Sequence, residues 1–374
     1  MDQSANAAGI TPFTAAEHDL LESTIISELE RVYAGYDLNF VSQSAAPSEP
    51  HETIDFAADL PDFVLGQAPL AAYNFSTERT VSVASDAFGF IVDEFFGTSN
   101  RPAQLNQLGT AIAGTAAHEL LHSFGTRHSA AYGTDGISHL NYNNTLGLQN
   151  QHLIATGSTG LGEFGRETQR VLGTWERAML DVAGRTGIGG KTLTLNDTNS
   201  FNLGEAGDFG EDANTAVDLT AANVFLPGAT SGLDLTVLQG TLNATDPADW
   251  MSVTVTGPAL LSAEVWSLDL FVNDFDSQLE VIDTDGTTVI AANGDNEYSG
   301  NTFGSGGNGS EDPFLVNVAL PEAGTYFVAL SAEELLTQTG VYQITLGIQD
   351  VPEPTTAVVL AAACLAAVRR RRVS

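Results

Sequence analysis

Two different hydrophobic periods divide the chain near its middle. In the first half, apolar residues recur at the spacing of amphipathic helices over residues 14–34, 102–124 and 163–183. Two other segments, residues 37–42 and 80–92, are rich in apolar and β-branched residues and predict short strands. Helices mixed with strands in this way predict an α+β domain.

After the glycine-rich segment 184–190, the hydrophobic period changes to two. Eight short stretches alternate apolar and polar residues and are separated by turn residues: 193–195, 233–237, 251–255, 261–265, 279–282, 314–318, 326–330 and 342–346. This pattern predicts an all-β, jelly-roll-like sandwich. The glycine run 184–190 has the composition of a linker between the two parts.

The charge balance limits the class of partner. Asp and Glu number 47 against 13 Lys and Arg, which gives a net charge of −34 and a pI near 4.1. Such a chain repels phosphate, so nucleic-acid binding is excluded. The single cysteine, Cys364, excludes an internal disulfide framework and a cysteine-ligated zinc site. Any metal must therefore be held by histidine and carboxylate.

Residues 118–128, HELLHSFGTRH, contain three of the seven histidines. His118 and His122 are four positions apart, so both imidazoles lie on one helical face and can bind one cation. Glu119 projects beside them, where a carboxylate can take a proton from an attacking water. A turn at Gly125 brings His128 back as a third ligand. Three protein ligands leave one position open, which is typical of a catalytic zinc site.

This HExxHxxGxxH pattern resembles the zinc signature of the metzincin metallopeptidases. The resemblance is strict over 118–128, and the layout agrees over roughly 10–185. It implies an α+β catalytic domain, zinc ligands at His118, His122 and His128, Glu119 as general base, and a protein or peptide substrate.

The expected methionine turn of metzincins is altered. Met179 and Met251, the only methionines after His128, lie too far along the chain. A better positional match is residues 138–142, SHLNY, which resembles the family's Ser-x-Met-x-Tyr form with Leu140 replacing methionine. Leucine is close to methionine in volume, so an apolar floor below the metal survives the exchange. Tyr142 could then reach the zinc or the oxyanion; the alternative is an ordinary loop tyrosine.

The acidic second half resembles the bacterial pre-peptidase C-terminal domain over about residues 211–348. The resemblance rests on the order of several short motifs, from DPADW at 246–250 to GVY at 340–342. It implies a non-catalytic β-sandwich that assists secretion or substrate binding. Carboxylates in its turns, Asp283, Asp285 and Asp295, are candidate Ca²⁺ ligands. The alternative is the solvated face of a very acidic protein.

The C-terminal segment 351–374 orders a Pro-Glu-Pro motif, an apolar run from Ala357 to Val368 and four arginines. It resembles the PEP-CTERM sorting signal of bacterial surface proteins. The resemblance implies export, transient anchoring in the inner membrane with the arginines on the cytoplasmic side, and processing by an exosortase-type enzyme. The alternative is a final helix packed on the body. The first residues have no basic segment and no apolar run, so they are not a secretory signal as they stand. Two alternatives stay open: the true start of the chain lies upstream, or the export signal is absent.

Together these patterns predict four regions: a metzincin-like peptidase domain over 1–186, a linker with a first strand over 187–210, a sandwich over 211–349, and a sorting tail with a short apolar helix over 350–374. The expected activity is zinc-dependent hydrolysis of peptide bonds at the cell surface or in the extracellular matrix. Two alternatives remain: a catalytically inactive surface protein with an adhesive role, and a purely structural matrix protein in which the histidine motif is coincidence.

Overall fold

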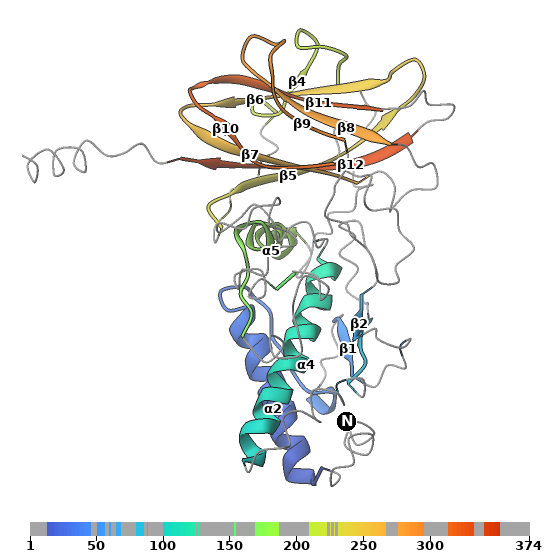
Figure 1. Ribbon diagram of the computed structural model, residues 1–374, viewed down its shortest axis with the longest axis vertical. Coiled ribbons are helices and arrows are strands. Elements are labelled where there is room, and N and C mark those ends of the chain that lie inside the picture. Colours follow the sequence, from blue (N-terminus) through green and yellow to red (C-terminus); the bar gives the residue numbers. More distant parts are fainter. Residues whose placement is uncertain are drawn as a thin grey trace, which may run out of the picture.

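The computed structural model has two parts, a helical half and a β-sandwich that lies above it in the view of Figure 1. It describes residues 13–45, 51–56, 60, 65–68, 80–85, 88, 100–124, 126, 153–154, 169–186, 209–222, 225, 228, 231–266, 276–294, 313–332 and 340–351. All structural statements below concern these residues.

Two helices, α2 and α4, lie side by side and run in the same direction, with Glu17 beside Arg101 at their first turns and Tyr33 beside Ala117 near their ends (Figure 1). Helix α2 (Ala15–Val32) begins at a capping box in which Thr14 and Glu17 each bind the other's backbone N–H. Helix α4 (Arg101–Ser123) begins at Asn100, whose side chain accepts from the Ala103 N–H at 3.4 Å. Both predicted helices, 14–34 and 102–124, are confirmed.

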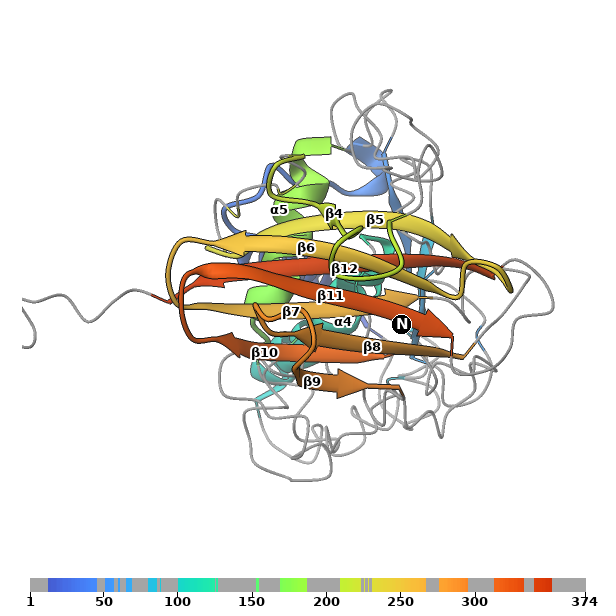
Figure 2. The same cartoon turned by 90° about the horizontal axis from the view of Figure 1, so that it is seen from above.

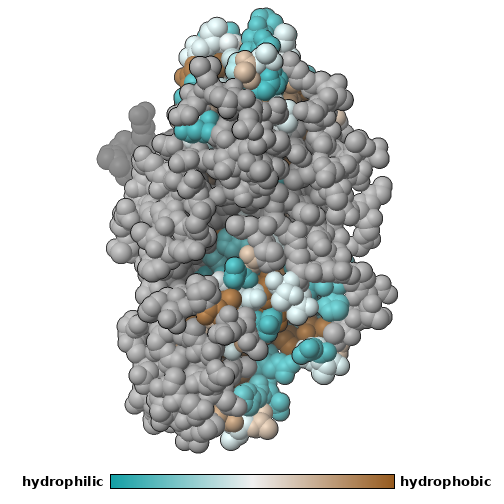
Figure 3. All heavy atoms as spheres, turned by 90° about the vertical axis from the view of Figure 1, so that its right-hand side faces the viewer, coloured by the Kyte–Doolittle hydropathy of each residue, from teal (hydrophilic) through white to brown (hydrophobic). Residues whose placement is uncertain are grey.

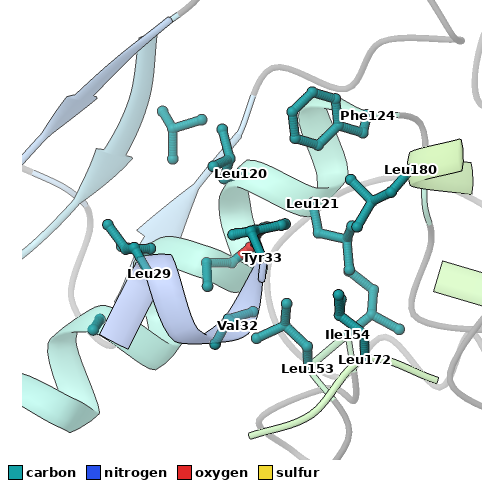
Figure 4. Packing of buried hydrophobic residues seen from close by; sticks show 14 of the residues in the cluster. Leu29, Val32, Tyr33, Leu120, Leu121, Phe124, Leu153, Ile154, Leu172 and Leu180 are labelled. Atoms are coloured by element: carbon teal, nitrogen blue, oxygen red, sulfur yellow. Dashed lines mark hydrogen bonds between the residues drawn. The ribbon is translucent and has the colours of Figure 1, made fainter. Parts of the chain in front are cut away.

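The apolar faces of α2 and α4 pack against each other. Leu21, Ile25 and Leu29 from α2 join one buried core with the residues that follow the same period on α4: Leu105, Leu108, Ile112 and Ala116. The approach is close at Gly109, where an added Cβ would lie 2.7 Å from Thr24 Cγ2. Toward the C-terminal ends of both helices, the Tyr33 hydroxyl donates to the Ala117 carbonyl at 2.7 Å. The core continues around Tyr33, as Figure 4 shows.

A three-stranded sheet lies beside α4. Strand β3 (Thr80–Val83) is central, with β1 (Thr53–Asp55) parallel on one side and β2 (Gly66–Gln67) antiparallel on the other. The prediction of strand over 80–92 is therefore confirmed for its first residues. The prediction of a strand over 37–42 is wrong, because this segment is irregular and leads into a short 3-10 turn, η1 (Gln43–Ala45). Its alternation arises because Leu38 and Phe40 pack on the helical core without a partner strand.

The third helix is shorter than predicted. Helix α5 spans Thr174–Thr186, whereas the pattern predicted 163–183. Residues 169–173 are not helical, because this stretch pairs with a distant segment: the Val171 carbonyl accepts from the Leu153 N–H at 2.9 Å. The helix also continues through Gly184, so the predicted linker begins inside it; residues 187–208 lie outside the described part.

The second half is a sandwich of two sheets (Figures 1 and 2). One sheet has the order β10-β7-β12-β5 and the other β4-β6-β11-β8-β9. The strands are β4 (Val217–Asp218), β5 (Asp234–Leu242), β6 (Ala248–Val255), β7 (Ala259–Trp266), β8 (Ser277–Ile282), β9 (Val289–Asn293), β10 (Phe314–Leu320), β11 (Gly324–Ala332) and β12 (Gly340–Asp350). The all-β part of the predicted fold is confirmed.

The strand register accounts for the alternating sequence. Along β12, Tyr342, Ile344 and Leu346 are buried in the core between the sheets. Ile344 lies opposite Leu238 of β5 and Val265 of β7, so three inward side chains share one level. The sequence missed β4, which has two residues, and β9, whose exposed valine and isoleucine break the alternation. The predicted strand at 193–195 lies outside the described residues.

The outer face of the four-stranded sheet packs on the helical half. Leu235, Val237 and Phe314 belong to the same buried core as α2 and α4. Trp175 of α5 meets Phe314 edge to face, with ring centroids 5.7 Å apart. A Cβ added to Gly347 would lie 2.7 Å from the Trp175 ring, so only glycine fits there. In the view from above, α5 runs beneath the strands of this sheet (Figure 2).

No described helix is both long and apolar enough to cross a membrane. Of the predicted sorting tail, 350–374, the structure describes Asp350, which is the last residue of β12, and Val351; the apolar run from Ala357 to Val368 lies outside the described residues. On the face seen in Figure 3, hydrophilic and hydrophobic side chains of the described residues are interspersed. The described part of that face therefore carries no single dominant apolar patch.

Candidate metal centre

Helix α4 places His118 and His122 one turn apart near its C-terminal end. Their Nε2 atoms lie 3.1 Å from each other, and the two rings are nearly perpendicular, with centroids 4.7 Å apart. The His118 side chain is buried and that of His122 is partly exposed. The helical spacing thus brings together the two histidines that the sequence predicted as ligands.

The outer nitrogen of each imidazole faces a backbone carbonyl. His118 Nδ1 lies 2.7 Å from the Leu153 carbonyl oxygen, and His122 Nδ1 lies 2.7 Å from that of Thr126. A carbonyl only accepts hydrogen bonds, so each Nδ1 carries the proton and each neutral ring turns an Nε2 lone pair toward the other. Burial lowers the pKa of His122 and so favours this neutral form, although the Thr126 carbonyl acts in the opposite direction.

The paired Nε2 atoms fit a metal. Two lone pairs at 3.1 Å repel each other, whereas a cation between them accepts both. Ligand nitrogens at ~2.0–2.1 Å from a tetrahedral zinc lie ~3.3 Å apart, close to the observed spacing. Histidines that donate through Nδ1 to a carbonyl and bind through Nε2 are the usual arrangement at zinc sites.

The chain reverses directly after α4. Phe124 N–H, Thr126 N–H and the Thr126 hydroxyl all return to the Leu121 carbonyl, the hydroxyl at 2.7 Å. This turn is what carries the Thr126 carbonyl back to His122. The predicted third ligand, His128, and Gly125 lie outside the described residues. Within the part of the chain that the structure describes, no three His, Cys, Asp or Glu side chains form a complete metal site.

Glu119 is buried next to the histidine pair, against strand β2. A Cβ on Gly66 would lie 2.5 Å from Glu119 Cγ, so glycine is what allows the carboxylate to lie there. The Ala68 N–H donates to this carboxylate. Burial raises the pKa of Glu119 to about 8, while the Ala68 N–H and the charge of Arg170 act in the opposite direction. A cation on the adjacent histidines would favour its ionised form.

A dipeptide far along the chain supports His118, and the sequence did not predict it. Leu153 and Ile154 are completely buried, packed beside Leu121 and Leu172 (Figure 4). Arg170 Nη1 donates to the same Leu153 carbonyl at 3.1 Å, and Ile154 N–H donates to Glu176 Oε1 at 2.8 Å. The local sequence pattern does not predict these hydrogen bonds, because each joins residues that are 17 or more positions apart.

Other predicted site residues are not placed. Leu140 and Tyr142, predicted for the methionine turn and the oxyanion, lie outside the described residues. Met179 is described and is buried in α5 as part of the helical core. Both residues of the methionine-turn match therefore stay predictions.

The candidate calcium ligands Asp283 and Asp285 lie in the turn between β8 and β9. Asp285 Oδ1 accepts from the backbone N–H groups of Thr287 and Thr288, and its Oδ2 accepts from the Thr288 hydroxyl at 2.6 Å. These hydrogen bonds lower the pKa of Asp285 to about 2. Gly286, with φ of 70°, completes the turn. Asp285 thus has a role in the hairpin without a cation, and Asp295 lies outside the described residues.

Comparison with known proteins identifies no family. No family model and no curated protein matches the chain. Among solved structures, the pre-peptidase C-terminal domain of a Bacillus anthracis collagenase is 12% identical, with 30% of this chain and 87% of that chain covered, at a TM-score of 0.21.

Two further solved structures are similar to parts of the chain. The C-terminal CBM6 of a Zobellia galactanivorans laminarinase is 14% identical over 30% of this chain and 99% of that chain, at a TM-score of 0.17. A Paenibacillus barengoltzii β-glucosidase is 10% identical over 51% of this chain and 16% of that chain, at a TM-score of 0.16. The assignment of a sandwich therefore rests on the strand pairing of this chain itself.

Proposed function

We propose that the chain is a zinc-dependent endopeptidase of the metzincin type, with His118, His122 and His128 as ligands and Glu119 as general base. The observation that carries the proposal is the pair of Nε2 atoms 3.1 Å apart, each ring held by a carbonyl at its Nδ1. A bound zinc would supply a Lewis acid that polarises a peptide carbonyl and activates water.

Glu119 would act as the general base, and strand β2 would bind the peptide. Glu119 lies in a buried position where a carboxylate with a raised pKa is suited to accept a proton from water and pass it to the leaving amine. Strand β2 contacts Glu119 through Gly66 and is an edge among the described strands of its sheet. An extended peptide that paired with Gly66–Gln67 would bring its backbone to the carboxylate.

The remaining regions fit an exported enzyme. The sandwich has the place and strand content expected of a pre-peptidase C-terminal-like accessory domain. The tail 351–374 would hold the exported protein at the inner membrane until an exosortase-type enzyme processes it. The mature protein would then act on protein or peptide substrates at the cell surface or in the extracellular matrix.

The test compares wild type with Glu119→Gln, both loaded with zinc, on casein and on a broad peptide library. The amide keeps the size of the side chain but takes no proton, so zinc content should stay near wild type while the rate falls about 10²–10⁴-fold. Glu30→Gln on the exposed face of α2 is the matched control and should cleave like wild type.

Two results would contradict the proposal. Equal rates for wild type and Glu119→Gln would assign the cleavage to another site or to contamination. No cleavage by zinc-replete wild type would favour the inactive surface protein instead. His122→Ala should lose metal and activity together, which separates loss of the metal from loss of the base.

A further inference from the structure

The dipeptide 153–154 is held by a bracket formed by residues 170–176. Leu153 N–H donates to the Val171 carbonyl at 2.9 Å. Ile154 N–H donates to Glu176 Oε1 at 2.8 Å, and Gly173 N–H donates to Glu176 Oε2. The Leu153 carbonyl accepts from Arg170 Nη1 at 3.1 Å and faces His118 Nδ1 at 2.7 Å.

We propose that Arg170 and Glu176 are positioning residues of the metal centre: by fixing the Leu153 carbonyl, they hold the His118 ring in the tautomer and orientation that turn Nε2 toward His122. The proposal rests on the proposed zinc site. It assigns a function to two charged side chains that packing alone does not require.

The two side chains act on different ends of one peptide segment. Glu176 accepts from two backbone N–H groups and so ties Ile154 to the start of α5. Arg170 fixes the carbonyl of the preceding residue from the side, at the second lone pair that His118 leaves available. Moving either end shifts the one oxygen that orients His118.

Burial shows how unusual these groups are in this chain. Glu176 is 0% exposed and Arg170 is 4% exposed. The sequence has only 13 basic residues, and burying an arginine costs desolvation free energy that an apolar residue at the same position would not. Arg170 is itself held, because Arg31 Nη2 donates to its carbonyl at 3.0 Å and its side chain crosses α4 at Gly114, where an added Cβ would lie 3.7 Å from Nε.

The test removes one charge at a time from the full chain. In Glu176→Gln the amide NH₂ must face one of two backbone donors, so one hydrogen bond is lost. In Arg170→Met the side chain keeps its length but loses the donor to Leu153. Arg101→Met, which breaks an ion pair with Glu17 at the far end of α4, is the control for general destabilisation. Glu30→Gln is the control for loss of a surface charge.

Two measurements follow, neither of which needs activity. The first is ¹⁵N-detected NMR of the metal-free protein at pH 8, which reports the tautomer of each histidine. Wild type and both controls should show His118 protonated at Nδ1. The two bracket variants, Glu176→Gln and Arg170→Met, should show His118 exchanging between the Nδ1-protonated and Nε2-protonated tautomers. The second is zinc affinity by competition with a chromophoric chelator, which should fall about 10–100-fold in the bracket variants alone.

Wild-type tautomer and affinity in both folded bracket variants would overturn the inference. If a charge-removing variant does not fold, Arg170→Lys provides the same test, because lysine keeps the charge and a donor. Its zinc affinity should fall less than 10-fold, and its His118 tautomer ratio should lie between those of wild type and Arg170→Met. No change in affinity or tautomer ratio would again overturn the inference. Failure of the proposed function looks different, because wild type would then bind no zinc although its His118 tautomer is fixed.

Discussion

The β8–β9 turn of the sandwich and the C-terminal end of α4 both depend on a carboxylate, and the two carboxylates behave in opposite ways. Asp285 is exposed, and among the described residues its side chain accepts from Thr287 and Thr288, two and three positions along the chain. These donors lower its pKa to about 2. Glu119 is buried between α4 and β2, and burial raises its pKa to about 8. One group is ionised and stabilises a turn, and burial keeps the other in its protonated form at neutral pH.

The two regions differ in whether neighbouring or distant residues determine their structure. The β8–β9 turn is held by hydrogen bonds between adjacent residues, so the turn follows from the local sequence, although strand β9 after it was not predicted. The end of α4 depends on contacts from Gly66, Leu153 and Arg170, which are far apart along the chain. Changes to long-range contacts should therefore have large effects, and changes to local contacts small ones.

The largest effect is expected at Trp175, which joins α5 to the sandwich. Its side chain is 1% exposed and packs on Phe314 and Gly347. Trp175→Ala should lower the free energy of unfolding by about 3–5 kcal/mol, because a large cavity opens between the two parts. A denaturant titration followed by circular dichroism measures this loss.

Trp250 is the matched control for this change. It lies on β6, is only partly buried, and contacts Phe327 with ring centroids 6.3 Å apart. Trp250→Ala should cost clearly less than Trp175→Ala. Equal losses would contradict the view that the interface between the parts is the more critical contact.

A smaller loss is expected at a buried long-range contact within the sandwich. The Tyr342 hydroxyl donates to Asp249 Oδ2 at 2.6 Å, and both residues are buried. Tyr342→Phe should lower the free energy of unfolding by about 1–3 kcal/mol, because the buried carboxylate loses a donor. The Tyr326 hydroxyl donates to the Glu322 carbonyl at 3.1 Å and accepts from the Glu322 N–H at 3.4 Å. Both partners are neutral, so Tyr326→Phe should cost less. The reverse order would remove the distinction between charged and neutral acceptors.

The smallest effect concerns the surface pair of Glu17 and Arg101. The Arg101 hydrogen bond, followed by the Thr14 N–H, lowers the pKa of Glu17 from 4.5 to about 2. Because the folded-state pKa lies below the unfolded value, its stabilisation is present above pH 4.5 and is lost as the pH falls toward 2. The pair is partly exposed, so Glu17→Gln should cost only about 1 kcal/mol at pH 7. Unfolding titrations at pH 7 and pH 3.5 should show this difference shrinking; a constant or growing difference would contradict it.

The distinction between local and long-range contacts also explains which elements the sequence predicted correctly. The helices over 14–34 and 102–124 and most strands of the sandwich follow from local periodicity, and the fixed spacing of His118 and His122 follows from the helix that carries them. The prediction of a strand over residues 37–42 is wrong because the alternation of apolar residues there reflects packing on the helical core. The helical period over 169–173 failed because those residues pair with Leu153, which no local pattern reveals.

Within the candidate site, only the residues on α4 were predictable. His118, Glu119 and His122 lie within five consecutive positions of one helix, so their spacing in the sequence is enough to place them together. Gly66, Arg170 and Glu176 enter through tertiary contacts, so their types alone carry no signal at the level of sequence.

The most direct test of the central claim is the metal content of the purified chain after zinc loading and removal of free metal. The wild type should hold about one zinc per chain, and variants with His118→Ala or His122→Ala should hold almost none, because each lacks one of the three proposed ligands, two of which have Nε2 atoms 3.1 Å apart on α4. Metal analysis by mass spectrometry measures the ratio. A folded wild-type protein without zinc, or an equal zinc content in wild type and both variants, would contradict the account.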